Sequence, residues 1–103
     1  MNNEQRVAIL EKIISLSKQM LELCQQQQWD EMVALEHQRK SLIAMVFPID
    51  ENDQTETVRD LLEMVLELNQ QIEMASRKAR DEVQSQLNGM SKQRKATAAY
   101  KSS

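Results

Sequence analysis

The fold is decided by residues 55–88, TETVRDLLEMVLELNQQIEMASRKARDEVQSQLN, which contain neither glycine nor proline. The stretch is rich in Leu, Glu, Gln, Met and Arg, which favour helix, and it lacks the two residues that most often interrupt one. We therefore predict a single helix over these residues, about 50 Å long at the usual rise of an α-helix. Thr55 is a suitable N-cap for this helix.

The apolar residues of this predicted helix become smaller along its length. Large side chains dominate its first half: Val58, Leu61, Leu62, Val65, Leu66, Leu68 and Ile72. Beyond them, the positions that face inward shrink to Ala75, Ala79, Val83 and Leu87. Small side chains leave a shallow groove that can accept an amphipathic helix, so we predict a partner-binding surface from Ile72 to Leu87.

Two shorter helices are predicted before it, over residues 4–27 and 30–47. The apolar residues of the first form two adjoining stripes, which requires contact with two neighbouring helices. These stripes are Val7, Leu10, Ile14, Leu21 and Cys24, and Ile9, Ile13, Leu16, Met20 and Leu23. Trp29 and Asp30 are interpreted as a hydrophobic staple and an N-cap of the second helix, with Trp29 as a partner anchor the less favoured reading. Pro48 should end that helix, because proline disfavours helical geometry in the residue before it. Its inward positions are Met32, Leu35, Leu42 and Val46.

Together these patterns predict an all-α fold. We expect an antiparallel helical bundle of three main helices, with a long third helix, plus a short C-terminal helix or tail. Residues 1–88 would form the bundle, and residues 48–55 its one real loop. Because the third helix overhangs the others and a chain of 103 residues has a small core, a homodimer through that helix is also expected.

Residues 89–103 differ from the rest of the chain in charge. They hold four basic residues and no acidic one, whereas residues 1–88 hold nine Lys and Arg against sixteen Asp and Glu. Gly89 is expected to end the third helix and to act as a hinge, because glycine tolerates the left-handed conformation. The basic C-terminal regulatory segment that follows, with Tyr100, would be either a short fourth helix over the groove or a frayed end.

Catalysis and cofactor binding are not predicted. The chain has one histidine, one cysteine and no glycine-rich phosphate loop, so no nucleophile, base and charge-stabilising group converge. We interpret His37, which lies beside Glu36 and near Arg39 and Lys40 on the polar side of the second helix, as a solvated surface residue. Cys24 is interpreted as a core residue. The carboxylates on one face of the third helix lack the histidine partners of a di-iron site, so no metal is expected.

A membrane-inserted or nucleic-acid-binding protein is also disfavoured. The apolar run that includes Ala44 to Phe47 is too short to span a membrane, and the polar start has no secretory signal. A single cysteine excludes an internal disulfide and favours a cytoplasmic location. The acidic body argues against direct nucleic-acid binding.

Two regions resemble a known family. The run Met20-Leu21-Glu22-Leu23-Cys24-Gln25, followed by Trp29-Asp30-Glu31-Met32, resembles the Leu-Leu-Glu-Leu-Ala-Gln and Glu-Trp-Asp-x-Leu pattern of the FliT-type flagellar export chaperones. The run Gln86-Leu87-Asn88-Gly89-Met90, followed by Gln93-Arg94-Lys95 and Ala99-Tyr100, is similar to that family's segment before its last helix and tyrosine. Lys101 departs from the glycine that is typical after the tyrosine.

The resemblance implies a cytoplasmic chaperone of flagellar type III export. Such a chaperone binds the C-terminal helical region of the flagellar filament-cap protein, prevents its premature assembly and delivers it to the export apparatus. The resemblance further implies that the C-terminal segment gates the substrate groove and that Tyr100 docks on the flagellar export gate. The export ATPase complex and, in some bacteria, the flagellar master transcription regulator are further implied partners.

Two other classes fit the residues. One is a coiled-coil adaptor or regulatory protein that binds a transcription regulator or dimerises through the third helix, with a tail that has no function. The other is a small regulator that uses its basic tail on nucleic acid, whose binding would depend steeply on salt.

Overall fold

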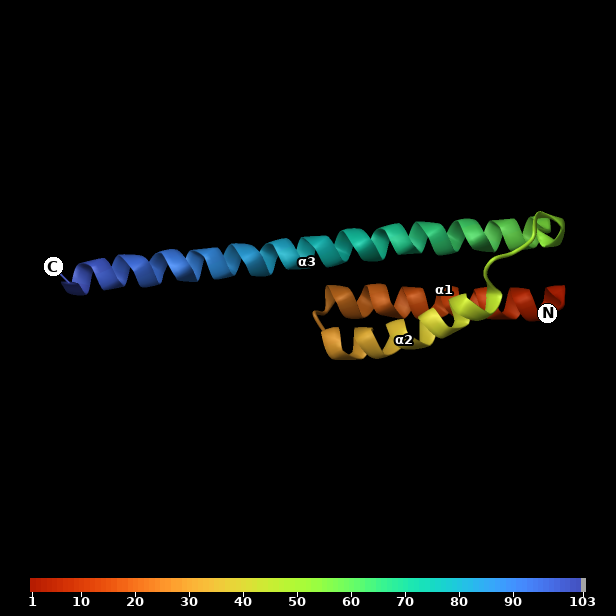
Figure 1. The fold of residues 1–103 in the computed structure, drawn as a ribbon, viewed down its shortest axis with the longest axis horizontal. Coiled ribbons are helices and arrows are strands. Elements are labelled where there is room, and N and C mark those ends of the chain that lie inside the picture. The colour runs from red at the N-terminus through yellow and green to blue at the C-terminus, as the bar shows by residue number, and fades with distance from the viewer. Residues whose placement is uncertain (103) are drawn as a thin grey trace.

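The computed structural model describes the backbone of residues 1–102 and the side chains of residues 1–89. The elements are α1 (Asn3–Gln25), α2 (Trp29–Val46), the short 3-10 helix η1 (Glu51–Asp53) and α3 (Glu56–Ser102). Consecutive α-helices run antiparallel, and the α1–α2 hairpin lies along the first half of α3 (Figure 1). No strand occurs in residues 1–102, so the predicted all-α bundle is confirmed.

The helix ends follow local sequence signals. Asn2 and Gln5 form a capping box at the start of α1. The N–H of Gln5 donates to Asn2 Oδ1 at 2.8 Å, and the N–H of Asn2 donates to Gln5 Oε1 at 3.0 Å. Thr55 accepts a hydrogen bond from the backbone N–H of Val58 at 3.3 Å, which confirms it as the N-cap of α3. Phe47, with φ −102° and ψ 147°, ends α2 in extended geometry just before Pro48, as predicted.

The turn between α1 and α2 has a different geometry from the one predicted. Gln27 has a φ of 59°, and its N–H donates to the carbonyl of Cys24 at 3.2 Å. The N–H of Gln28 donates to the carbonyl of Leu23 at 2.9 Å, so the two bonds form a Schellman motif without its usual glycine. α2 then begins at Trp29, with Gln28 at the N-cap position. The prediction of Asp30 as N-cap is therefore wrong; its charge lies in the first turn, where the helix dipole favours it.

The core lies between α1 and its two neighbours. α1 packs against both α2 and α3, which confirms the prediction from its two apolar stripes, whereas α2 and α3 approach each other little. The largest buried cluster is made of Leu10, Ile13, Ile14, Val46, Val58, Val65 and Leu68. It occupies the end of the bundle where α1 and α3 begin, and α2 contributes only Val46 to it.

α3 does not end at residue 88 as predicted. It continues through Gly89 to Ser102, a helix of 47 residues that is about 70 Å long. Gly89 does not have a positive φ. A glycine inside a helix costs only about 1 kcal/mol relative to alanine, and helix-forming residues on both sides outweigh that cost. The C-terminal segment is therefore the last part of α3, and it points away from the α1–α2 hairpin (Figure 1).

Candidate partner-binding groove

α3 meets the end of the α1–α2 hairpin at Ser76. The Oγ of Ser76 lies 3.7 Å from the Sγ of Cys24, which is buried near the end of α1, as predicted for this cysteine. Beyond this contact α3 leaves the hairpin, and every residue of the range 80–89 is exposed. The positions after Ser76 therefore form the border between the packed and the free parts of α3.

A hollow of about 440 Å³ lies between α2 and α3 at this border. We call it the α2–α3 groove, and its lining consists of Trp29, Met32, Ser76, Ala79, Arg80, Val83 and Gln84. Trp29 is 38% exposed and Val83 is 50% exposed, so apolar surface is open to solvent on both helices. Arg80 and Gln84 add one charged and one amide side chain to this apolar surface. Such a hollow can receive an apolar side chain from a partner.

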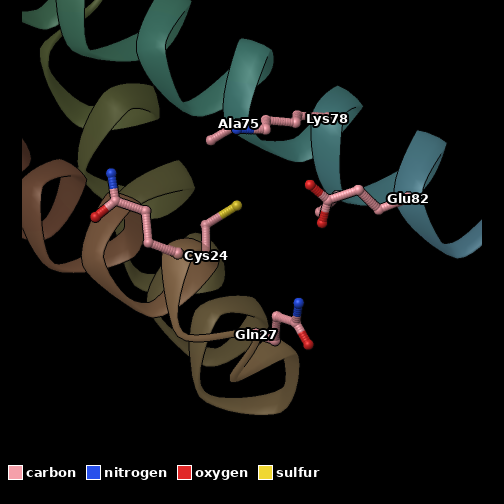
Figure 2. Close-up of a pocket in the computed structure, with 7 residues that line it drawn as sticks. Cys24, Gln27, Ala75, Lys78 and Glu82 are labelled. Atoms are coloured by element: carbon pink, nitrogen blue, oxygen red, sulfur yellow. The ribbon is translucent and has the colours of Figure 1, made fainter.

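A second hollow, of about 250 Å³, lies on the other side of the α1–α2 turn. Figure 2 shows the Cys24 sulfur directed into it from α1, with Lys78 and Glu82 on the facing side from α3. Ala79 lines this hollow as well as the α2–α3 groove. A large side chain at position 79 would therefore fill space in both.

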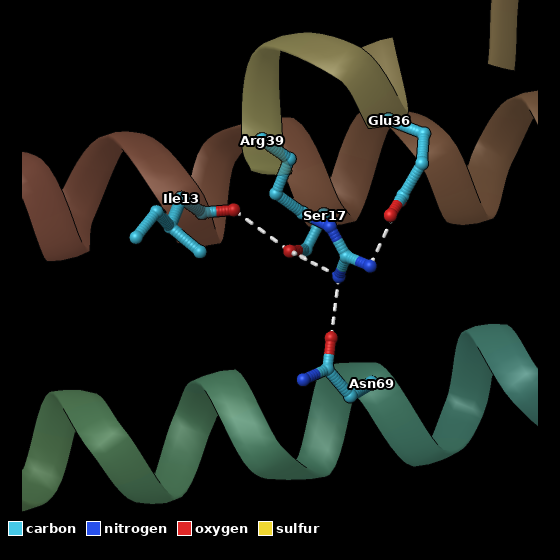
Figure 3. Close-up of polar contacts among 5 residues, drawn as sticks. All are labelled: Ile13, Ser17, Glu36, Arg39 and Asn69. Atoms are coloured by element: carbon cyan, nitrogen blue, oxygen red, sulfur yellow. Dashed lines mark hydrogen bonds and ion pairs between the residues drawn. The ribbon is translucent and has the colours of Figure 1, made fainter. Parts of the chain in front are cut away.

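One buried polar cluster ties the three helices together. Arg39 of α2 donates from Nη1 to Ser17 Oγ of α1 at 3.3 Å and also to Asn69 Oδ1 of α3 (Figure 3). Its Nη2 donates to Glu36 Oε2 at 2.9 Å, while the Ser17 hydroxyl donates to the carbonyl of Ile13 at 2.7 Å. Arg39 was predicted to lie on the polar side of its helix, and its burial corrects that prediction.

The comparisons with known proteins give the family. The family model described as Flagellar protein FliT matches residues 7–102, which includes both helices of the groove. The chain belongs to the FliT family. No curated protein and no solved structure gives a significant match. The FliT match confirms the resemblance that the motifs on either side of the α1–α2 turn indicated.

The structure brings together only part of the surface that the sequence predicted for this FliT-family chain. Ala75 and Ala79 are half-buried beside the turn, and Val83 and Leu87 are exposed. Ile72 is buried, with 6% exposure, so it belongs to the core and the accessible surface begins at Ala75. Gly89 is exposed on α3, and the side chain of Tyr100 lies outside the described residues.

Sequence reasoning did not favour the α2 side of the groove as a binding surface. Trp29 was assigned to the hairpin turn, with a partner anchor as the less favoured interpretation, and Met32 was assigned to the core, but both line the groove. Their spacing of three residues on the first turn of α2 places them on one face, and Val33 beside them is 53% exposed. This excess of apolar residues at the start of a short helix was the available signal.

The described residues of this FliT-family chain offer neither a metal site nor a membrane-spanning helix. Among the residues whose side chains are described, no three His, Cys, Asp or Glu side chains lie close enough together to hold a metal ion. None of the helices, over the residues described, combines the length and the apolar character needed to cross a membrane.

Proposed function

We propose that this protein is a cytoplasmic flagellar export chaperone that binds the C-terminal helical region of the filament-cap protein in the α2–α3 groove. Binding would keep the cap protein from assembling too early and deliver it to the type III export apparatus. Membership of the FliT family supports the role of a flagellar export chaperone. The observation that carries the binding site is the open apolar groove between Trp29 and Met32 of α2 and Ala79 and Val83 of α3.

The groove suits an amphipathic helix better than an extended peptide. Its walls are helices, and within residues 1–89 the structure has no sheet edge for strand addition. Met32 can adapt its unbranched side chain to different partner surfaces. Covering the exposed part of Trp29 or Val83 would contribute about 1 kcal/mol for each residue, since full burial is worth about 1.5–3 kcal/mol. Contributions of this size favour reversible binding, which a delivery chaperone needs.

The C-terminal segment is proposed to gate this groove. In the continuous α3 of the structure the segment leads away from the groove, so this arrangement leaves the groove uncovered. Closing would require α3 to break at Gly89, where glycine makes a break least costly, and the segment to fold back. We also propose, from the family resemblance, that Tyr100 docks on the export gate, and that the export ATPase complex and the flagellar master transcription regulator are further partners.

The binding site is tested by placing a charge in it. Ala79→Arg fills space in both hollows beside the turn, whereas Gln70→Arg adds the same side chain at an exposed position of α3 that lines neither hollow. We expect Ala79→Arg to weaken binding of a cap-protein C-terminal peptide at least about tenfold, about 1.4 kcal/mol, by calorimetry. Gln70→Arg should leave the affinity unchanged. Equal affinities of both variants and the wild type would place the site elsewhere.

A further inference from the structure

Arg39 is the one buried side chain with a formal charge among residues 1–89. It comes from α2, and its guanidinium reaches an acceptor on each of the three helices: Glu36, Ser17 and Asn69. Since α2 and α3 approach each other little, its hydrogen bond to Asn69 is a rare direct link between these two helices.

This link lies between the apolar core, which reaches Leu68 on α3, and the α2–α3 groove. Arg39 is seven residues from Met32, and Asn69 is seven residues from Ser76, so each is two helical turns, about 10 Å, from the groove lining. A side chain that sets the separation of α2 and α3 at this level also sets the separation of the groove walls two turns away, because both helices are continuous.

The cluster is poorly arranged as a source of stability alone. Arg39 Nε is buried and has no hydrogen-bond partner, and the side chain of Glu36 is 43% exposed. Burying a guanidinium carries a large desolvation penalty, and buried ion pairs can often be replaced by apolar residues of similar volume without loss of stability. A guanidinium that donates to acceptors at fixed positions on two helices specifies one spacing and register, whereas apolar side chains of similar volume can repack in more than one way.

We propose that Arg39 is a positioning residue that fixes the spacing and register of α2 relative to α3 and so keeps the α2–α3 groove open. The effect on partner binding rests on the proposed function, but the effect on helix spacing does not. Asn69 is the acceptor through which Arg39 acts on α3, and Ser17 anchors the guanidinium to α1.

The first test separates positioning from stability. Arg39→Met keeps an unbranched aliphatic chain but removes all the hydrogen-bond donors. Asn69→Leu removes the acceptor on α3, whereas Asn69→Asp keeps an acceptor there. We expect Arg39→Met to keep or raise the melting temperature, whereas Asn69→Leu, which leaves the buried guanidinium with one acceptor fewer, should lower it. Both variants should weaken binding of the cap-protein peptide about tenfold. Asn69→Asp should bind as the wild type does. Retained affinity in Arg39→Met, or loss of affinity in Asn69→Asp, would overturn the proposal.

The second test needs no partner. Spin labels are attached to cysteines introduced at His37 of α2 and Gln71 of α3, both exposed, in a Cys24→Ala background. Arg39→Met should shift or broaden the distance distribution between these labels. A control pair at Lys18 of α1 and Gln71 should be unaffected, because α1 and α3 remain packed. An unchanged His37 to Gln71 distribution would overturn the proposal. Failure of the wild type to bind the peptide would overturn the proposed function. The distance distribution between the His37 and Gln71 labels would then test the role of Arg39 in helix spacing by itself.

Discussion

At the scale of single residues, Gln27 adopts a strained backbone conformation that the neighbouring residues do not predict. Its φ of 59° is a conformation that glycine adopts freely, while a residue with a Cβ pays about 1 kcal/mol for it. The run Gln25 to Gln28 gives no local indication of which residue turns left-handed. The two Schellman hydrogen bonds and the packing of the hairpin select Gln27.

Gln27→Gly is expected to stabilise the protein. Relief of the left-handed strain should outweigh the added flexibility of the unfolded chain and raise the free energy of unfolding by roughly 0.5 kcal/mol. The matched control is Gln26→Gly, since Gln26 has a φ of −86° and gains nothing from glycine. The free energy of unfolding of both variants is measured by urea denaturation followed by circular dichroism. A Gln27→Gly variant as unstable as Gln26→Gly would contradict this account of the turn.

At the scale of helices, the length of α3 governs how its C-terminal segment acts. Deleting Lys92 to Ser103 should tighten peptide binding by about 1 to 2 kcal/mol, or about five- to thirty-fold, if the segment competes for the groove. Gly89→Ala should reproduce part of this gain, because alanine favours the continuous helix by about 1 kcal/mol and its Cβ would meet no atom within 4 Å. Calorimetry on both variants checks this. Unaltered affinities would remove the gating role.

The helices could be predicted from the sequence where the signals are local. The two stripes of α1, the cap at Thr55 and the stop before Pro48 each depend on a few neighbouring residues, and the structure bears them out. The prediction that the third helix ends at Gly89 was wrong because a single glycine disfavours helix only weakly compared with the helix propensity of its neighbours. A local signal of that size cannot decide a helix end by itself.

The site was harder to predict because it depends on contacts between helices. Arg39 falls at the same helical spacing as the inward positions Leu35, Leu42 and Val46, so its burial could have been suspected. Its acceptor Asn69 is thirty residues away, and no pattern within one helix reveals that pairing. In the same way, the place where α3 leaves the hairpin follows from the relative lengths and packing of all three helices.

At the scale of the whole molecule, the chain is a rod of 74 × 20 × 19 Å rather than a compact bundle. The hairpin packs along the first half of α3. In the free half, the side chains of Val83 and Leu87 are 50% and 55% exposed. Apolar side chains along a free helix favour association with a second helix. The same surface can therefore serve a partner protein or another copy of the chain.

We expect weak homodimerisation through the free part of α3. Analytical ultracentrifugation should detect a monomer–dimer equilibrium at high micromolar concentration, because only a few apolar side chains are available on that surface. Leu87→Asp should shift the equilibrium to monomer, whereas Gln84→Asp, which adds the same charge three residues earlier, should do so less. A strict monomer at the highest concentrations would exclude the dimer.

The central claim is that the partner helix binds between α2 and α3, and chemical-shift mapping tests it most directly. The labelled protein is titrated with a peptide from the C-terminal helical region of the filament-cap protein, and backbone and side-chain signals are followed by NMR. We predict that the largest changes occur at Trp29, Met32, Ala79 and Val83, which line the groove from both helices. Changes confined to the exposed residues Leu66 and Met74, which lie outside the groove, would contradict the account.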